Sequence, residues 1–193
     1  MVEKLYLGLI LLFFIAAFAI KNIKTYLSTR QSIKGKSKKL SISILLSTFI
    51  YVLIALRITV LKPIWFLEIY LFEFEIIRIM GLIILSIGFI IGIFSLIAMK
   101  KSWRVGIKYD QKTKLVSSGV YRISRNPYFL SYYVLILGYI FVYPSLILLV
   151  LYVTLVFVFH KMILVEEKYL ETMHGDLYLN YKKKVKRYFS SKL

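Results

Sequence analysis

Five apolar segments of near membrane-spanning length, separated by charged loops, constrain the fold of this chain more than any other feature. A helix needs roughly 20 apolar residues to cross a bilayer. The segments are residues 5–20, 40–61, 79–99, 128–143 and 145–165. Only Pro144 separates the last two, which predicts a helical hairpin. We therefore expect an all-α integral membrane protein with five transmembrane helices.

The positions of Lys and Arg predict how the helices are oriented in the membrane, because cytoplasmic loops collect positive charge. Of the 27 basic residues, seven lie in 21–39, eight in 100–127 and eight from Lys161 onward. Only four lie elsewhere, at Lys4, Arg57, Lys62 and Arg78. We expect a multi-pass protein of the cell membrane with its N-terminus outside and its C-terminus in the cytosol.

Composition also limits the partners and the chemistry. The formal net charge is +18, but the basic residues are spread over three juxtamembrane segments, which favours anionic lipid headgroups over nucleic acid. Cysteine is absent, and His160 and His174 do not have the spacing of a metal pair. We expect the lipid bilayer as a partner, with no nucleic acid and no metal.

Residues 1–99 are expected to form a three-span membrane scaffold. Ala17-Phe18-Ala19 also fits a signal-peptide cleavage site, but the seven positive charges that follow would resist translocation. In the third span, Gly88 and Gly92 favour close helix packing over a ligand site. Arg57 lies near the end of the second span, where it either needs a partner within the bilayer or reaches outward to water. It is a candidate substrate residue.

The segment 100–127 differs from a bare linker, since turn-forming residues alternate with aromatic and basic ones. Asn126 can cap the next helix and Pro127 fits its first turn, which leaves a helix N-terminus that favours an anionic group. Glu166 and Glu167 follow the fifth span and face Arg122 and Arg125 across the hairpin. These groups predict a shared polar pocket, although a capped helix and a solvated turn are the simpler alternatives.

Three ordered motifs carry a resemblance: LVSSGVYRISRNPYFL at 115–130, EE at 166–167 and HGDLYLNYKKKVKRY at 174–188. Together they resemble the isoprenylcysteine carboxyl methyltransferase family, which is similar to the phospholipid N-methyltransferases. The resemblance implies S-adenosylmethionine as the cofactor. It also implies a methyltransferase region at 100–193, with a cytosolic pocket formed by the loop before the fourth helix and by the C-terminal helix.

Nine positions occupy the family's cofactor-binding stretches. By resemblance, the cofactor-binding residues are Lys114, Leu115, Val116, Tyr121, Asn126, Pro127, Tyr128, Phe129 and Glu166. The chain departs from the family at three positions. Asn126 replaces a His, Phe129 replaces a Tyr, and Met162 stands where the prenylcysteine enzymes have an Arg for the substrate carboxylate.

The implied activity is methyl transfer to a lipophilic acceptor that enters laterally from the bilayer, such as a prenylcysteine-like carboxylate. Alignment and exclusion of water are the enzyme's main tasks in such a displacement. A carboxylate acceptor needs no base, whereas an amine needs one, and Glu167 and His160 are the catalytic candidates. Lys161 joins Arg57 as a candidate substrate residue. The alternatives are a phospholipid or small-amphiphile N- or O-methyltransferase and a non-catalytic membrane binding or scaffold protein.

Overall fold

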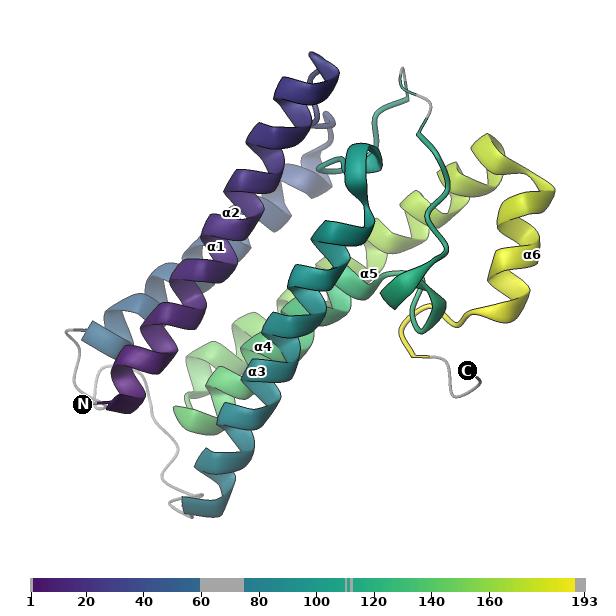
Figure 1. Ribbon diagram of the computed structural model, residues 1–193. Coiled ribbons are helices and arrows are strands. Elements are labelled where there is room, and N and C mark those ends of the chain that lie inside the picture. The colour runs from purple at the N-terminus through teal and green to yellow at the C-terminus, as the bar shows by residue number, and fades with distance from the viewer. Residues whose placement is uncertain (1, 60–74, 110, 112, 190–193) are drawn as a thin grey trace.

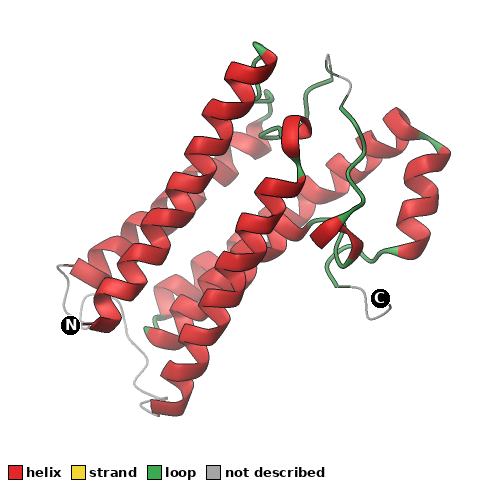
Figure 2. Ribbon diagram, viewed as in Figure 1, coloured by secondary structure: helices red, strands yellow, loops and turns green. Residues whose placement is uncertain are grey.

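The computed structural model describes residues 2–59, 75–109, 111 and 113–189, and helices dominate these ranges (Figure 1). The α-helices are α1 (Val2–Thr29), α2 (Lys38–Thr59), α3 (Glu75–Ala98), α4 (Pro127–Val142), α5 (Leu146–His174) and α6 (Asp176–Lys184). Two 3-10 helices, η3 (Lys100–Ser102) and η4 (Gly119–Arg122), lie between α3 and α4. The described part contains no strand (Figure 2). The predicted all-α class is confirmed.

Four helices, α1, α2, α3 and α5, are long and apolar enough to cross a membrane. The predicted fourth span forms α4, whose 16 residues rise only about 24 Å, less than the roughly 30 Å of the hydrocarbon core. Large apolar side chains stay exposed on the outside of the bundle, including Leu45, Phe94 and Phe157. These helices are those of a multi-pass membrane protein with four to five spans.

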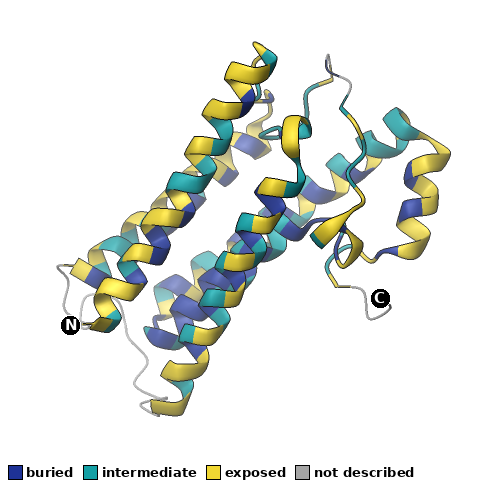
Figure 3. Ribbon diagram, in the orientation of Figure 1, coloured by how far each residue is buried: buried dark blue, intermediate teal, exposed yellow. Residues whose placement is uncertain are grey.

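Close packing of α3 against α4 forms the centre of the bundle. A Cβ atom at Gly88 would overlap the backbone of Leu135, and one at Gly138 would overlap Leu85. Leu85 and Leu135 are both fully buried, and α4 is largely dark blue in Figure 3. Glycine here lets the two backbones approach closely, so the packing interpretation of the third-span glycine is confirmed.

The fifth predicted span is part of a longer helix. α5 has 29 residues, about 43 Å at the usual rise, and continues well beyond Val165, where its apolar stretch ends. Ser145 caps its start by accepting a hydrogen bond from the backbone N–H of Leu148. At Gly175, with a φ of 52°, the chain turns back into α6 (Figure 1). Glu166 and Glu167 therefore lie within a helix and not in a solvated turn.

Candidate functional site

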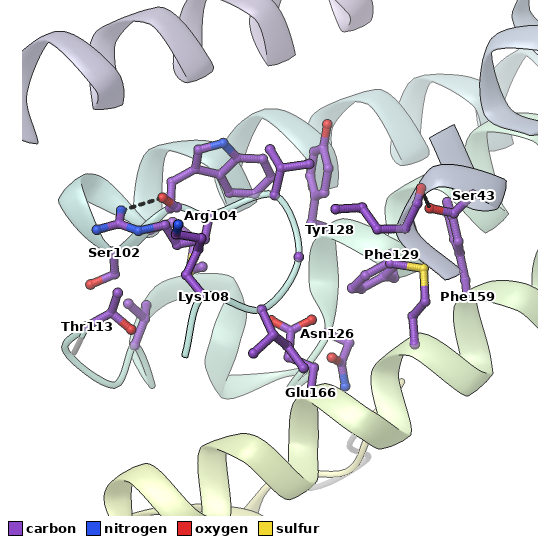
Figure 4. Close-up of a pocket in the computed structure, with 18 of the residues that line it drawn as sticks. Ser43, Ser102, Arg104, Lys108, Thr113, Asn126, Tyr128, Phe129, Phe159 and Glu166 are labelled. Atoms are coloured by element: carbon purple, nitrogen blue, oxygen red, sulfur yellow. Dashed lines mark hydrogen bonds between the residues drawn. The ribbon is translucent and has the colours of Figure 1, made fainter. Parts of the chain in front are cut away.

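A cavity of about 340 Å³ lies where α1, α3 and α5 end and where α2 and α4 begin. Described residues from Ser102 to Tyr121, with polar side chains such as Arg104, line one side of it, which we call the loop end. Residues of α1, α2, α4 and α5 line the other side, which we call the helix end. Figure 4 shows Arg104, Lys108 and Thr113 at the loop end, Ser43, Phe129 and Phe159 at the helix end, and Tyr128, Asn126 and Glu166 between them.

The connection between α1 and α2 holds the loop end in place. The backbone N–H of Val105 donates to the carbonyl of Ile33 at 2.9 Å, and that of Gly35 donates to Val105 at 2.8 Å. A side chain at Gly35 would collide with the carbonyl oxygen of Ile107. The amide of Gln111 also donates to the Ser32 carbonyl at 3.0 Å. This connection, which we call the clasp (residues 32–35), fixes the loop against a distant part of the chain.

The structure gathers the predicted cofactor residues around this cavity. Eight of the nine line it, namely Lys114, Leu115, Val116, Tyr121, Asn126, Tyr128, Phe129 and Glu166. Pro127 is the exception, because it is fully buried at the first turn of α4, as its sequence position predicted. Burial also raises the pKa of the Tyr121 phenol, as does the nearby Glu166 carboxylate. The phenol is therefore a neutral hydroxyl at physiological pH.

Glu166 reaches the cavity from the part of α5 that lies beyond the apolar stretch. Its carboxylate makes no hydrogen bond or ion pair with the residues that the structure describes. Burial, followed by the neighbouring charge of Glu167, raises the pKa of Glu166 to about 7. A partly buried carboxylate in these surroundings gains most from a cationic or hydrogen-bond-donating ligand.

Glu167 points to different partners and does not line the cavity. Its Oε1 accepts hydrogen bonds from Nε and Nη2 of Arg125 at 3.2 and 2.9 Å, and its Oε2 accepts from Nε and Nη2 of Arg187 at 3.1 and 2.9 Å. Burial disfavours the ionised form of the Glu167 carboxyl, but the two guanidinium groups hold the pKa of Glu167 below its usual range. The expected contact with Arg125 is present, whereas Arg122 is exposed. The arrangement makes Glu167 part of a buried ion cluster, so we do not carry its predicted catalytic role further.

Asn126 occupies the cap position of α4, but its side chain does not cap the helix, so that prediction is wrong. Its Nδ2 donates instead to Oε1 of Glu167 at 3.2 Å and to the carbonyl of Arg187 at 3.3 Å. Ser124 Oγ donates to the same carbonyl at 3.1 Å, and the Arg125 backbone N–H donates to Lys186. The Asn126 side chain bonds to the buried Glu167 carboxylate instead of capping α4. Together these hydrogen bonds tie the C-terminal segment to the start of α4.

The remaining candidates lie away from the cavity lining. His160 Nδ1 is 2.6 Å from the hydroxyl of Tyr188, and Lys161 is exposed on α5. The guanidinium of Arg57 lies 4.2 Å from the ring centroid of Tyr143, near the far end of α2. Fourteen residues of helix, about 21 Å, separate Arg57 from Ser43 at the cavity. Catalytic and substrate roles for these residues stay predictions that their positions do not favour.

The sequence interpretation missed the part of the helix end that α1 and α2 supply. Ser43, Ser47 and Tyr51 of α2 line the cavity together with Phe14 and Phe18 of α1. One signal was present, since polar residues four apart lie on the same face of a helix and are uncommon in an otherwise apolar span. Apart from Arg57, the first two spans are predicted only as scaffold, because no motif links them to the loop end.

A known protein family matches the part of the chain that supplies much of this cavity. The family model described as phospholipid methyltransferase matches residues 76–176, from α3 to the first residue of α6, which is more than half of the chain. The chain belongs to the phospholipid methyltransferase family. A search among curated proteins gave no match. The family match takes in the loop end and the cavity-facing residues of α4 and α5, whereas α1, the clasp and α2 lie outside it.

Proposed function

We propose that this protein is an S-adenosylmethionine-dependent methyltransferase that methylates a lipophilic acceptor within the membrane. The observation that carries the proposal is one continuous cavity with a polar loop end and a more apolar helix end, lined in part by residues of a methyltransferase family match. A polar, charged cofactor and an apolar acceptor need these two environments side by side. A scaffold protein has no need for such a cavity.

The residues at the loop end and around Glu166 suit the cofactor chemically. Glu166 would hold the ammonium group or the ribose hydroxyls, and Lys108 and Lys114 lie on the same cavity for its carboxylate. Tyr178 also lines the cavity, and its hydroxyl is buried without a partner at hydrogen-bonding geometry among the described residues. An orphaned buried hydroxyl is costly and is the kind of group that a polar ligand satisfies.

The helix end favours a lipid amine over a carboxylate as the acceptor. Met162 lines the cavity one turn before Glu166, and the described lining of the helix end carries no Lys or Arg to bind a carboxylate. Instead, the aromatic rings of Phe14, Tyr128 and Tyr132 pack together in the wall of the cavity, and such rings attract an ammonium group. A prenylcysteine-like carboxylate is the second candidate, because it follows from the motif resemblance.

The chain's own contribution to the reaction is to align the acceptor with the cofactor's methyl group and to exclude water. When bound, the cofactor supplies an activated methyl group, whose bond to sulfur breaks as its bond to the acceptor forms, leaving a neutral thioether. The buried aromatic residues of the helix end would keep water from the acceptor, and Glu166 would fix the cofactor's orientation. An amine acceptor also loses a proton, and Glu166 is a cavity-lining carboxyl whose pKa is raised to about 7.

Two measurements test the proposal. Isothermal titration of the detergent-solubilised protein with S-adenosylmethionine should give binding at sub-millimolar concentration, and its absence would overturn the enzyme assignment. A radiolabelled methyl-transfer assay on total membrane lipid and on prenylcysteine analogues, run side by side, should label the amine-containing lipid. Label only on the prenylcysteine analogue would establish the second candidate instead.

A further inference from the structure

The chain after α6 returns to the edge of the membrane-spanning part. α5 extends about 13 Å beyond Val165, and α6, which has 9 residues, runs back over a similar length (Figure 1). The hydroxyl of Tyr188 then lies 2.6 Å from Nδ1 of His160, and its ring centroid lies 5.9 Å from that of Tyr133 on α4. His160 belongs to the apolar stretch of α5, which ends at Val165. The chain therefore comes back to the boundary between bilayer and water.

One side of this returning segment is bound to the protein. We call the segment, residues 182–189, the strap. Arg187 forms an ion pair with Glu167 at 2.9 Å, and Lys182 forms one with Glu171. Both carboxylates belong to α5. Ion pairs therefore hold the strap against α5, and each of these two acids already has a basic partner from the strap.

The other side of the strap is basic and exposed. Lys183, Lys184 and Lys186 are all exposed, and none makes an ion pair with the described residues. Phe189 follows them with 69% of its surface exposed. Basic residues beside an exposed aromatic ring are typical of segments that lie in a membrane interface. The strap therefore offers a charged and partly apolar face at the level of the bilayer surface.

The chemistry of this face fits a membrane surface better than a small anion. The three lysine side chains do not line the cavity, and their exposure leaves them without walls that would enclose a free phosphate. A leaflet that contains anionic lipids presents many negative charges in one plane and attracts nearby Lys and Arg residues. Charge complementarity and position at the bilayer edge thus point to the same partner.

We propose that the strap docks on anionic phospholipid headgroups of the bilayer that the protein spans, through Lys183, Lys184 and Lys186. Docking on the outer side favours the conformation in which Arg187 and Tyr188 are bonded on the inner side, and so stabilises the folded protein. The inference goes beyond the proposed function, because it needs neither the cofactor nor the methyl acceptor.

The thermal midpoint of the detergent-solubilised protein tests the proposal, since a ligand that binds only the folded state raises it. Phosphatidylglycerol should raise the midpoint, whereas phosphatidylcholine should not. Each lysine near an anionic surface favours binding about fivefold. Lys183→Gln, Lys184→Gln and Lys186→Gln combined should therefore weaken the apparent affinity for phosphatidylglycerol about 100-fold, if the three contributions add.

A second triple variant is the matched control. Lys36, Lys38 and Lys39 are exposed too, and they lie before and at the start of α2. Replacing all three with Gln changes the net charge by the same amount and should leave most of the midpoint shift in place. Salt at about 1 M, where charges are screened within about 3 Å, should remove the shift from the wild type.

Four results would overturn the proposal. They are no midpoint shift with phosphatidylglycerol, equal shifts with both lipids, a wild-type response in the strap variant, and an equal loss in the control variant, which would make net charge the cause. Glycerol phosphate without lipid is tested as well, and a shift equal to that of phosphatidylglycerol would replace the membrane surface with a free anion. None of these measurements involves S-adenosylmethionine, so a failure of the proposed function would leave them unchanged.

Discussion

The loop end and the helix end of the cavity differ in how the chain builds them. At the loop end, Lys114, Leu115, Val116 and Tyr121 come from one short stretch, and all four lie within the family match. At the helix end, α1 and α2 supply an apolar wall from outside that match. The family match therefore covers these loop-end residues but not the part of the helix end that α1 and α2 supply.

The two ends also differ in what keeps them in place. The clasp holds the loop end through backbone hydrogen bonds, and the buried charges of Arg125, Glu167 and Arg187 hold the C-terminal segment against the start of α4 next to it. Aromatic and apolar packing around Phe14 forms the helix end. The loop end should therefore respond to changes in charge and backbone, and the helix end to changes in size and hydroxyl content.

The largest effect is expected from breaking the ion cluster beside the loop end. Glu167→Ala leaves the Arg125 side chain, only 7% exposed, without its carboxylate, and should lower the free energy of unfolding by about 3–5 kcal/mol. Denaturant unfolding in detergent measures it. Glu171→Ala on the same helix is the control, because its more exposed pair with Lys182 contributes less than about 1 kcal/mol. Equal losses in both variants would contradict the assigned role.

Removing the charge of Glu166 should separate cofactor binding from folding. Glu166→Gln is expected to weaken S-adenosylmethionine binding about 10- to 100-fold, the range for a hydrogen bond to a charged group, with unfolding free energy unchanged or higher. Isothermal titration gives the affinity. Glu171→Gln serves as the control, since Glu171 does not line the cavity. Wild-type affinity in Glu166→Gln would remove Glu166 from the cofactor site.

A methyl group in the clasp tests whether distant backbone contacts hold the loop end. Gly35→Ala would push the added Cβ against the Ile107 carbonyl and should lower the unfolding free energy by about 1–3 kcal/mol, with weaker cofactor binding. Gly8→Ala on α1 is the matched control, because nothing lies within 4 Å of a Cβ there. If both variants behave alike, the clasp does not hold the loop.

The smallest effect is a dependence of cofactor affinity on pH. Burial has raised the pKa of Glu166 to about 7, so its ionised form is lost as the pH falls through 7. Affinity for S-adenosylmethionine should drop about tenfold between pH 8 and pH 6. Titrations at several pH values measure it, with Glu166→Gln as the control that should show no such drop. A flat profile in the wild type would mean that another group binds the cationic part.

How much of the molecule could be predicted varied with the distance between the interacting residues. The five apolar segments gave α1 to α5, and Pro127 began α4 as expected, because both signals are local. The cap by Asn126 was also a local prediction, but Glu167 bonds that side chain instead. A buried carboxylate far along the chain gave a stronger partner than the free N–H groups of the helix.

The sequence by itself determined the membrane class, the helical segments and the residues at the loop end, since hydropathy and short motifs act over neighbouring positions. Only the tertiary structure decided that the Glu166 side chain lines the cavity, whereas the Glu167 side chain forms ion pairs within a buried cluster. It also decided that α2 brings Tyr51 beside Tyr132 of α4. The reason is physical: spacing along a helix fixes which residues share a face, but helix packing decides what that face meets.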